Sequence, residues 1–259
     1  MNIKFWLKTL MHTVTPGGFG HERSLREFKD SSYVHDRDKN PIRDKHAGGK
    51  GWSNWSGGIR GRSYESYDEY KLHQSLKFDE ILKMKGGFSN TEILSYRIKF
   101  YNRFKYLSSY LPYSSRILCA GARQGTEVDV LRDLGFHNSY GIDLNPGPNN
   151  PLVIKGDFLN IQEPDRSIDL IYSNALDHSF NLEKMFSEHS RVLTDTGYVL
   201  YDIPLNNNYF GGAFEAIDWK QSSLIVNEVI SRHRVIHKLE REKDWVWLLC
   251  QSPKKGTLI

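Results

Sequence analysis

The chain has 259 residues, of which 39% are hydrophobic and 25% charged, and its formal net charge is +4. This composition is typical of a soluble globular protein and excludes an intrinsically disordered chain. The two cysteines, Cys119 and Cys250, are too few for a disulfide framework or a cysteine-based metal site. No apolar stretch approaches the roughly 20 residues of a membrane span, and we find no signal peptide in MNIKFWLKTLMH. We therefore expect a cytoplasmic protein without a membrane span.

Residues 13–62 hold few regular patterns and are punctuated by Gly and Pro, with Trp52 and Trp55 among them. A segment of this kind is usually functional or disordered. Residues 1–62 also carry 12 Lys or Arg against six Asp or Glu. The excess suits a phosphate-bearing or acidic partner, although solvated loop charge is the commoner explanation. Further on, the spacing of apolar residues predicts two helices, one beginning near Tyr64 and one over 91–110.

From Arg116 the sequence alternates between strand and helix patterns. The predicted strands cover residues 116–120, 139–143, 151–155, 168–173, 198–203, 234–239 and 246–251, and the predicted helices cover 126–134, 182–193 and 214–231. Such alternation is typical of a parallel sheet covered on both faces, whereas the short link before the last strand requires an antiparallel pair. We predict an α/β fold, a Rossmann-like sheet of seven mostly parallel strands with an antiparallel C-terminal hairpin. Residues 95–259 would form this domain and residues 1–94 an N-terminal extension.

Polar and glycine-rich motifs follow the predicted strands in order. The first is the turn GARQG at 121–125, between a strand and a helix start, where glycine allows close approach of a ligand and free N–H groups favour negative charge. Next, GIDLN at 141–145 places an acid at the tip of the second predicted strand, and GDF at 156–158 places one after the third. The remaining motifs are SIDLIYSN at 167–174, ALDH at 175–178 and SRVLTDTGY at 190–198.

In this order and spacing, the motifs resemble those of class I S-adenosylmethionine-dependent methyltransferases, in particular the type 11-like group. The resemblance implies S-adenosylmethionine as cofactor and S-adenosylhomocysteine as product. The glycine loop would hold the methionine part, Asp143 the ribose hydroxyls and Asp157 the adenine amino group. The cofactor-binding residues implied in this way are Gly121, Ala122, Arg123, Gly125, Asp143, Leu144, Asp157, Phe158, Asn174 and His178.

The glycine loop departs from the usual family pattern at two positions. Cys119 stands where an acid is common, and Arg123 stands where a glycine is common. Arg123 could contact the cofactor's carboxylate or simply face solvent. Glu127 could replace the missing acid near the cofactor's amino group, or it could be an ordinary acid at a helix start.

The residues after the fourth predicted strand of the core would face the methyl acceptor. His178 is the candidate general base, because imidazole accepts a proton near neutral pH; it could also bind the cofactor or cap a helix. Asp177 could orient that imidazole, act as the base or cap a helix, and Asp202 could face the acceptor or cap a turn. A divalent metal on Asp177, His178 and Asp202 is an alternative whose spacing is not diagnostic, and we predict no metal.

Aromatic faces with amide and guanidinium donors suit a sugar. We predict that Trp52, Trp55, Arg60, Tyr64 and Tyr209 line the acceptor site, although the same residues could merely cover the cofactor. The stretches GARQGTEV and GIDLNPG also resemble methyltransferases of glycan modification, which implies O-methylation of a sugar hydroxyl. Another small molecule or RNA is the alternative acceptor. DNA is not expected, because the Asn/Asp-Pro-Pro-aromatic signature is absent. A catalytically silent cofactor- or partner-binding module is the alternative of a different class.

Overall fold

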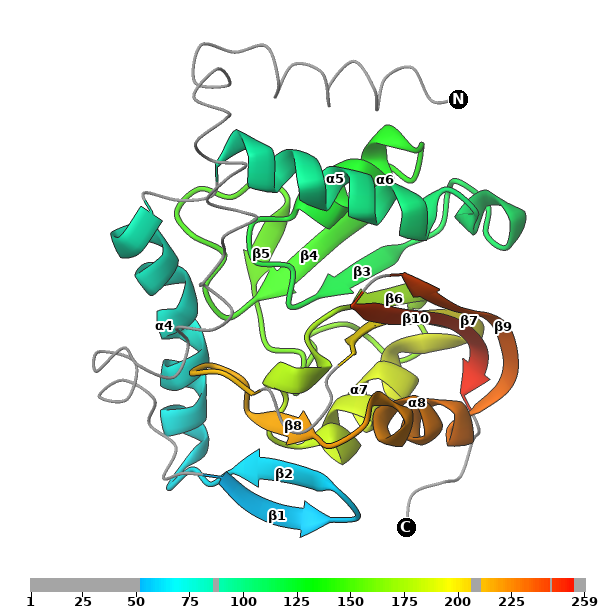
Figure 1. Ribbon diagram of the computed structural model, residues 1–259. Coiled ribbons are helices and arrows are strands. Elements are labelled where there is room, and N and C mark those ends of the chain that lie inside the picture. Colours follow the sequence, from blue (N-terminus) through cyan, green and yellow to red (C-terminus); the bar gives the residue numbers. More distant parts are fainter. Residues whose placement is uncertain (1–51, 86–88, 206–210, 243, 254–259) are drawn as a thin grey trace.

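The computed structural model of the chain describes residues 52–85, 89–205, 211–242 and 244–253 (Figure 1). Its main element is a seven-stranded sheet in the order β5-β4-β3-β6-β7-β10-β9. The strands are β3 (Ile117–Ala120), β4 (Ser139–Asp143), β5 (Val153–Lys155), β6 (Ile168–Ser173), β7 (Leu193–Pro204), β9 (His233–Glu242) and β10 (Trp245–Pro253). Strands β5, β4, β3, β6 and β7 run parallel to one another, and β10 is antiparallel to both β7 and β9. The predicted Rossmann-like fold with its antiparallel hairpin is confirmed.

Helices cover both faces of this sheet. The helices α5 (Asn90–Phe104) and α6 (Thr126–Asp133) lie on one face, and α7 (Leu182–Val192) and α8 (Ser222–Ser231) lie on the other (Figure 1). Strand β3 shows how the pleat separates two cores: Ile117 and Cys119 belong to the cluster under α5 and α6, whereas Leu118 and Ala120 belong to the cluster under α7 and α8. A strand buried on both faces is continuously apolar, as the ILCA sequence of β3 is.

The second predicted helix is α5, and the sequence explains where it begins. Ser89 and Glu92 form a capping box, in which the Ser89 hydroxyl accepts from the Glu92 N–H at 3.2 Å and the Glu92 carboxylate accepts from the Ser89 N–H at 2.9 Å. Arg97, fully buried, donates to Asp129 and, at 2.7 Å, to Asp133 of α6. The predicted division of the chain at residues 94 and 95 therefore falls inside a helix that packs on the main domain.

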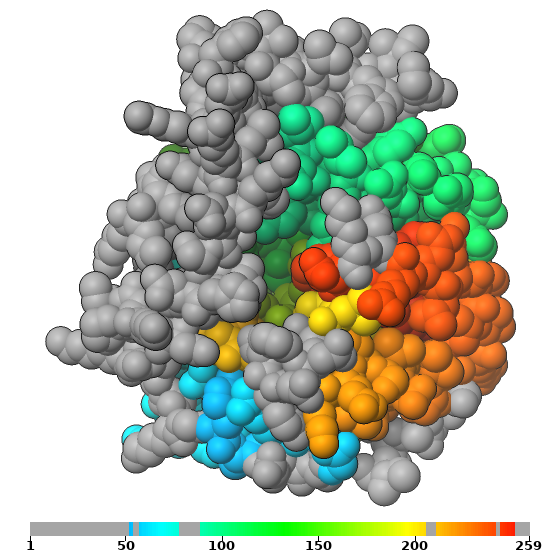
Figure 2. Space-filling view, in the orientation of Figure 1, coloured from blue at the N-terminus to red at the C-terminus, as the bar shows by residue number. Residues whose placement is uncertain are grey.

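A small second sheet lies below the main one, in the order β1-β2-β8. It joins the hairpin of β1 (Trp52–Ser56) and β2 (Ile59–Arg62) to β8 (Ile217–Trp219), and all pairs are antiparallel. Gly57 and Gly58 turn the hairpin with φ of 53° and 96°, a conformation that favours glycine. In the space-filling view the hairpin (blue) adjoins the β8 region (orange) (Figure 2).

This sheet corrects two expectations. The long loop predicted over 13–62 contains a hairpin from residue 52, and the helix predicted over 214–231 begins only at Ser222, after β8. Ile217 and Trp219 are fully buried, so their apolar character reflects a three-residue strand rather than a helix face. The partner strand is over 150 residues away in the sequence, which no local pattern reveals.

Helix α4 (Tyr67–Lys85), the first predicted helix, stands across the ends of the strands rather than on a face of the sheet (Figure 1). Among the described residues, no helix has the length and apolar character needed to cross a membrane. Both cysteines are free and buried, Cys119 in β3 and Cys250 in β10, as expected of core thiols.

Candidate active site

The glycine loop connects β3 to α6 at the carboxyl end of the sheet. Gly121 and Gly125 have φ of 79° and 82°. A Cβ on Gly121 would lie 2.7 Å from the Ala175 Cβ, and one on Gly125 would lie 2.7 Å from the Val153 Cγ2. Both positions thus require glycine for conformation and for space. The loop backbone can therefore lie closely against its neighbours at the edge where such sheets bind ligands.

We expect Gly121→Ala to destabilise the fold more than Gly57→Ala. Gly57 also has positive φ, but no atom lies within 4 Å of its added Cβ, so only backbone strain of about 1–2 kcal/mol remains. At Gly121 the collision with Ala175 adds overpacking of about 1–3 kcal/mol. Urea unfolding of the two variants measures the difference. Equal losses of unfolding free energy would show that the loop relaxes around the methyl group.

Arg123 occupies the middle of the loop with φ of 47°, in the left-handed region. This is the conformation that a glycine would adopt without strain, which explains how an arginine departs from the usual pattern while the loop keeps its shape. The Arg123 N–H donates to the Asp143 Oδ2 at 2.9 Å. That bond helps to hold the strained residue in place.

Asp143, the last residue of β4, joins the glycine loop to the loop that follows β4. Its Oδ1 accepts from the Asn145 N–H at 2.9 Å, while its Oδ2 accepts from Arg123. A carboxylate has about four lone-pair positions, so two backbone donors leave acceptor capacity on both oxygens. The predicted ribose ligand is therefore rigidly oriented beside the glycine loop.

Asp157 and Phe158 follow β5. The Asp157 Oδ1 accepts from the Leu159 N–H at 2.8 Å, and its Oδ2 accepts from the Tyr67 hydroxyl of α4. Burial, together with this hydrogen bond, raises the pKa of Tyr67 well above its usual value. Phe158 is largely buried, and its ring lies 3.8 Å from the position of a Cβ on Gly121. The acid predicted to face adenine thus already has a partner from the N-terminal extension.

Glu127, at the start of α6, is only 6% exposed. Burial raises the pKa of this carboxyl to about 8, against the opposing effect of the nearby Arg123. The carboxyl lies near Asp143 and Lys99 as well. It is therefore a candidate partner for a cationic group of a ligand, because a positive charge beside it would restore its ionised form.

The raised pKa of Glu127 gives a pH prediction. The native protein keeps this proton up to about pH 8, whereas the unfolded chain releases it near 4.5. Its contribution to stability is therefore lost as the pH rises from 4.5 to 8. Glu127→Gln cannot ionise, so its unfolding free energy does not carry this loss. We expect the unfolding free energy of the variant, relative to that of the wild type, to be higher at pH 9 than at pH 5. Urea titrations at both pH values test this, and a pH-independent difference would contradict it.

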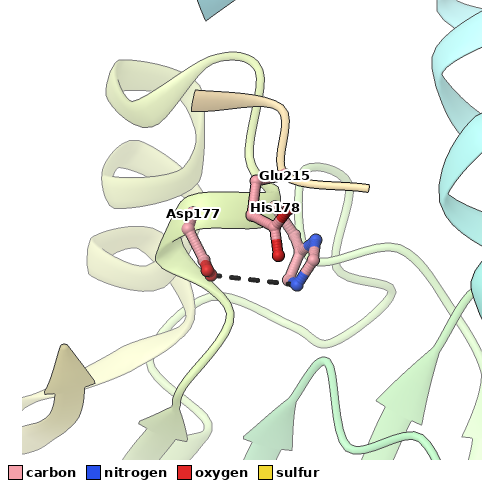
Figure 3. Close-up of side chains that lie close together, drawn as sticks. All are labelled: Asp177, His178 and Glu215. Carbon is pink, nitrogen blue, oxygen red and sulfur yellow. Dashed lines mark ion pairs between the residues drawn. The ribbon is translucent and has the colours of Figure 1, made fainter. Parts of the chain in front are cut away.

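Two acidic side chains and one imidazole, those of Asp177, Glu215 and His178, lie close together after β6 (Figure 3). Asp177 and His178 lie on a 3₁₀ turn, Leu176–His178, after β6, and Glu215 comes from the segment that leads into β8. One oxygen or nitrogen of each lies within 4.8 Å of the others, and the Asp177 Oδ1 is 3.9 Å from the His178 Nε2. The Ala216 N–H donates to the Asp177 carbonyl at 2.8 Å, which joins the two segments. We call these three residues the acid–imidazole cluster.

The hydrogen bonds of His178 fix its tautomer. The Lys77 ammonium of α4, which can only donate, lies 2.7 Å from Nε2. The Nδ1–H faces the Gln74 Oε1 at 3.0 Å and the Phe214 carbonyl at 3.1 Å. Burial, and then the Lys77 charge, lower the pKa of His178 to about 3. The imidazole is neutral, with its acceptor nitrogen toward Lys77.

Helix α4 supplies more of the site than the sequence analysis expected. Besides Tyr67, Gln74 and Lys77, its Tyr70 hydroxyl donates to the His178 carbonyl at 3.1 Å. The Ser75 carbonyl accepts from the Asn145 amide at 3.0 Å. The helix thus contacts the loops after β4, β5 and β6.

Asp202 lies apart from these residues. It is fully buried near the end of β7, where it accepts from Lys99 at 2.9 Å and Arg103 at 3.2 Å, both on α5. The Tyr172 hydroxyl lies 3.4 Å away. The carboxylate therefore belongs to a buried charge network under α5, and the structure brings Glu215 rather than Asp202 to Asp177 and His178.

The predicted acceptor residues are only partly brought together. The Trp52 ring lies 4.6 Å and 4.4 Å from the guanidinium carbons of Arg60 and Arg62. Arg60 also pairs with the buried Asp218 at 2.9 Å. The Tyr64 hydroxyl is 2.9 Å from the His73 Nδ1. Tyr209 and the side chain of Trp55 lie outside the part of the chain that the structure describes.

The site includes three residues that the sequence analysis did not identify: Gln74, Lys77 and Glu215. Gln74 and Lys77 continue the helical spacing of Tyr67 and Tyr70 at intervals of three and four residues, so they share one face of α4. That spacing could have found them. Glu215 has no such signal, since only the fold brings it to His178.

The fold agrees with solved structures. An N1-methyltransferase of Burkholderia thailandensis, with bound 1,6-didemethyltoxoflavin and S-adenosylhomocysteine, aligns at TM-score 0.58 and 11% identity over 78% of this chain and 99% of its own. An S-adenosylmethionine-dependent methyltransferase of Thermotoga maritima aligns with a TM-score of 0.51 and 14% sequence identity, and the alignment covers 70% of this chain and 100% of that one. A protein of Pyrococcus horikoshii aligns with a TM-score of 0.50 and 16% sequence identity, and the alignment covers 61% of this chain and 91% of that one.

These likenesses define the class of fold: it is the Rossmann-like fold of class I S-adenosylmethionine-dependent methyltransferases. Within it, residues 118–201 match the family described as methyltransferase domain. The matched segment runs from β3 to β7 and contains the glycine loop, Asp143, Asp157 and the turn of Asp177 and His178. No curated protein matches the chain.

Proposed function

We propose that this protein transfers a methyl group from S-adenosylmethionine to a hydroxyl of a sugar in a glycan. The observation that carries the methyl-transfer part is the glycine loop joined to Asp143, in a segment that matches a methyltransferase domain. The sugar acceptor is the finer part of the proposal, and it rests on the side chains around the acid–imidazole cluster.

The residues present fit the cofactor. Gly121 and Gly125 let the loop backbone pack directly against Ala175 and Val153, where any side chain would collide, and this gives the loop its close turn after β3. Asp143 is oriented with acceptor capacity left for ribose hydroxyls. We assign His178 to the acceptor side, and we assign cofactor binding to the rest of the set predicted from the sequence: Gly121, Ala122, Arg123, Gly125, Asp143, Leu144, Asp157, Phe158 and Asn174.

S-adenosylmethionine supplies an electrophilic methyl group on a sulfonium. The protein must orient the acceptor oxygen in line with that group and stabilise the loss of the hydroxyl proton. We assign the second task to Asp177, His178 and Glu215 as a group, because they converge after β6. Two carboxylates and a neutral imidazole can accept hydrogen bonds from an acceptor hydroxyl and orient its lone pairs.

Aromatic side chains beside the cluster support a sugar acceptor. The partly buried rings of Tyr64 and Tyr67 each have a centroid 5.9 Å from that of Phe180, and both pack on the fully buried Tyr70. Tyr70 also donates to the His178 carbonyl. Ring faces and hydroxyls in one place suit the alternating C–H and O–H groups of a sugar.

A transfer assay with methyl-labelled S-adenosylmethionine tests the proposal. The purified full chain is offered mono- and oligosaccharides, with RNA and small heteroaromatic and phenolic compounds in parallel. We expect label in a saccharide. Label only in RNA or in a small aromatic compound would support the methyl-transfer part of the proposal and overturn the sugar acceptor. Binding of the cofactor without transfer to any class would favour a catalytically silent cofactor-binding module.

A further inference from the structure

The acid–imidazole cluster has the dimensions of a metal site. Two ligand atoms that are each about 2.0–2.4 Å from one divalent cation lie at most about 4.8 Å apart. The three atoms of Asp177, His178 and Glu215 lie within 4.8 Å of one another. Figure 3 shows the carboxylates and the imidazole directed toward one another.

The backbone holds the ligands in these positions. Arg62 donates to the Glu215 carbonyl at 2.8 Å and to the Gly212 carbonyl at 2.7 Å, so the segment that carries Glu215 is tied to β2. The Ala216 N–H ties the same segment to the Asp177 carbonyl. A site whose ligands come from segments joined in this way needs little rearrangement to receive a cation.

His178 is oriented as a metal ligand is. Its Nδ1–H faces the Phe214 carbonyl at 3.1 Å and the Gln74 amide oxygen at 3.0 Å, which leaves Nε2 without a proton, 2.7 Å from the Lys77 ammonium and 3.9 Å from the Asp177 Oδ1. Metal-binding histidines almost always donate the other ring N–H to a carbonyl or carboxylate in this manner.

A positive charge already lies beside the imidazole of the cluster. Two carboxylates at this separation repel each other, and a cation beside them offsets that repulsion. The Lys77 ammonium lies 2.7 Å from the His178 Nε2, the same nitrogen that is 3.9 Å from the Asp177 Oδ1. Lys77 reaches the cluster from α4, whereas the three ligands belong to the loops after β6 and before β8.

We propose that Asp177, His178 and Glu215 bind a divalent metal cation, and that the Lys77 ammonium and the metal compete for the same position. One imidazole and two carboxylates suit a cation that accepts both nitrogen and oxygen ligands, such as Mn²⁺. The inference rests on the proposed function for its use: a cation here would bind acceptor hydroxyl oxygens and lower the pKa of one of them. It revises the expectation that the protein uses no metal.

Isothermal titration of Mn²⁺ into the full chain, without cofactor or acceptor, tests the site. We expect saturable binding at about one cation per chain, weakened at least tenfold in Glu215→Gln and in Asp177→Asn. The matched controls Glu183→Gln and Asp165→Asn change exposed carboxylates and should bind as the wild type does. Lys77→Met removes the competing ammonium and should tighten binding severalfold.

Three results would overturn the inference: no saturable binding up to millimolar Mn²⁺, equal weakening in the control variants, or unchanged affinity in Lys77→Met. The last variant retains all three ligands, so it remains informative if a ligand variant fails to fold. Cofactor binding measured on the same proteins without metal separates the two proposals. Cofactor binding without Mn²⁺ binding leaves the proposed function standing alone, whereas Mn²⁺ binding without cofactor binding overturns the proposed function and leaves the metal site.

Discussion

Asp143→Ala is expected to lower the affinity for S-adenosylmethionine by at least about 100-fold. The proposed bonds from two ribose hydroxyls to a carboxylate are charge-assisted and contribute about 1.5 kcal/mol or more each, or about 3 kcal/mol together. The same change removes the acceptor for the Arg123 and Asn145 N–H groups, which loosens the glycine loop. Titration calorimetry with the purified variant gives the affinity directly.

Asp169→Ala is the matched control for that experiment. Asp169 also lies on a strand and accepts a backbone N–H, that of Arg116, at 2.9 Å. It lies near the start of β6, whereas Asp143 ends β4 at the carboxyl edge of the sheet. We expect the control to lose stability without losing cofactor affinity. Undiminished affinity in Asp143→Ala would remove Asp143 from the cofactor site.

His178→Ala is expected to lower turnover by about 100-fold or more while cofactor affinity changes by less than threefold. The imidazole belongs to the group that we assign to the acceptor hydroxyl, and such assistance contributes about 10²- to 10⁴-fold. Steady-state kinetics with the acceptor found in the transfer assay, together with calorimetry of the cofactor, measure both quantities.

His237→Ala serves as the control, because His237 is exposed on β9 and its partner is Gln251 of the neighbouring strand. Equal losses of turnover and cofactor affinity in His178→Ala would assign the residue to the cofactor rather than to the acceptor. Unchanged turnover would exclude His178 from the chemistry and leave the two carboxylates of the cluster.

The main sheet could be predicted because its signals are local. Strands β3 to β6 are short runs rich in apolar residues that end beside a glycine, an acid or an amide. The few residues between β9 and β10 allow only an antiparallel pair. Asp143 and Asp157 could be predicted for the same reason, since the carboxyl ends of parallel strands share one edge. Local order along the chain, combined with one rule of sheet geometry, was sufficient.

The remainder depends on contacts between distant segments. Strand β8 is three residues long, and its apolar residues also fit a helix pattern, so only pairing with β2 distinguishes the two. Asp202 lies near the end of a strand as Asp143 does, but its side chain pairs with Lys99 and Arg103 of α5 instead of facing the site. Glu215 lies in the segment between β7 and β8, and only the folded arrangement of that segment brings it to His178. Sequence patterns carry no information on such pairings without related sequences to compare.

The contacts of α4 have a consequence for how the protein is made. The helix leaves the ribosome before its partners in the site: Asp157 follows Tyr67 by 90 residues, and His178 follows Lys77 by 101. The Phe214 carbonyl that accepts from Gln74 comes 140 residues later. During synthesis the polar side chains on this face of α4 therefore lack these hydrogen-bond partners until the segment before β8 has emerged. The α4 side of the site can therefore be completed only after strands β3 to β7 have been synthesised.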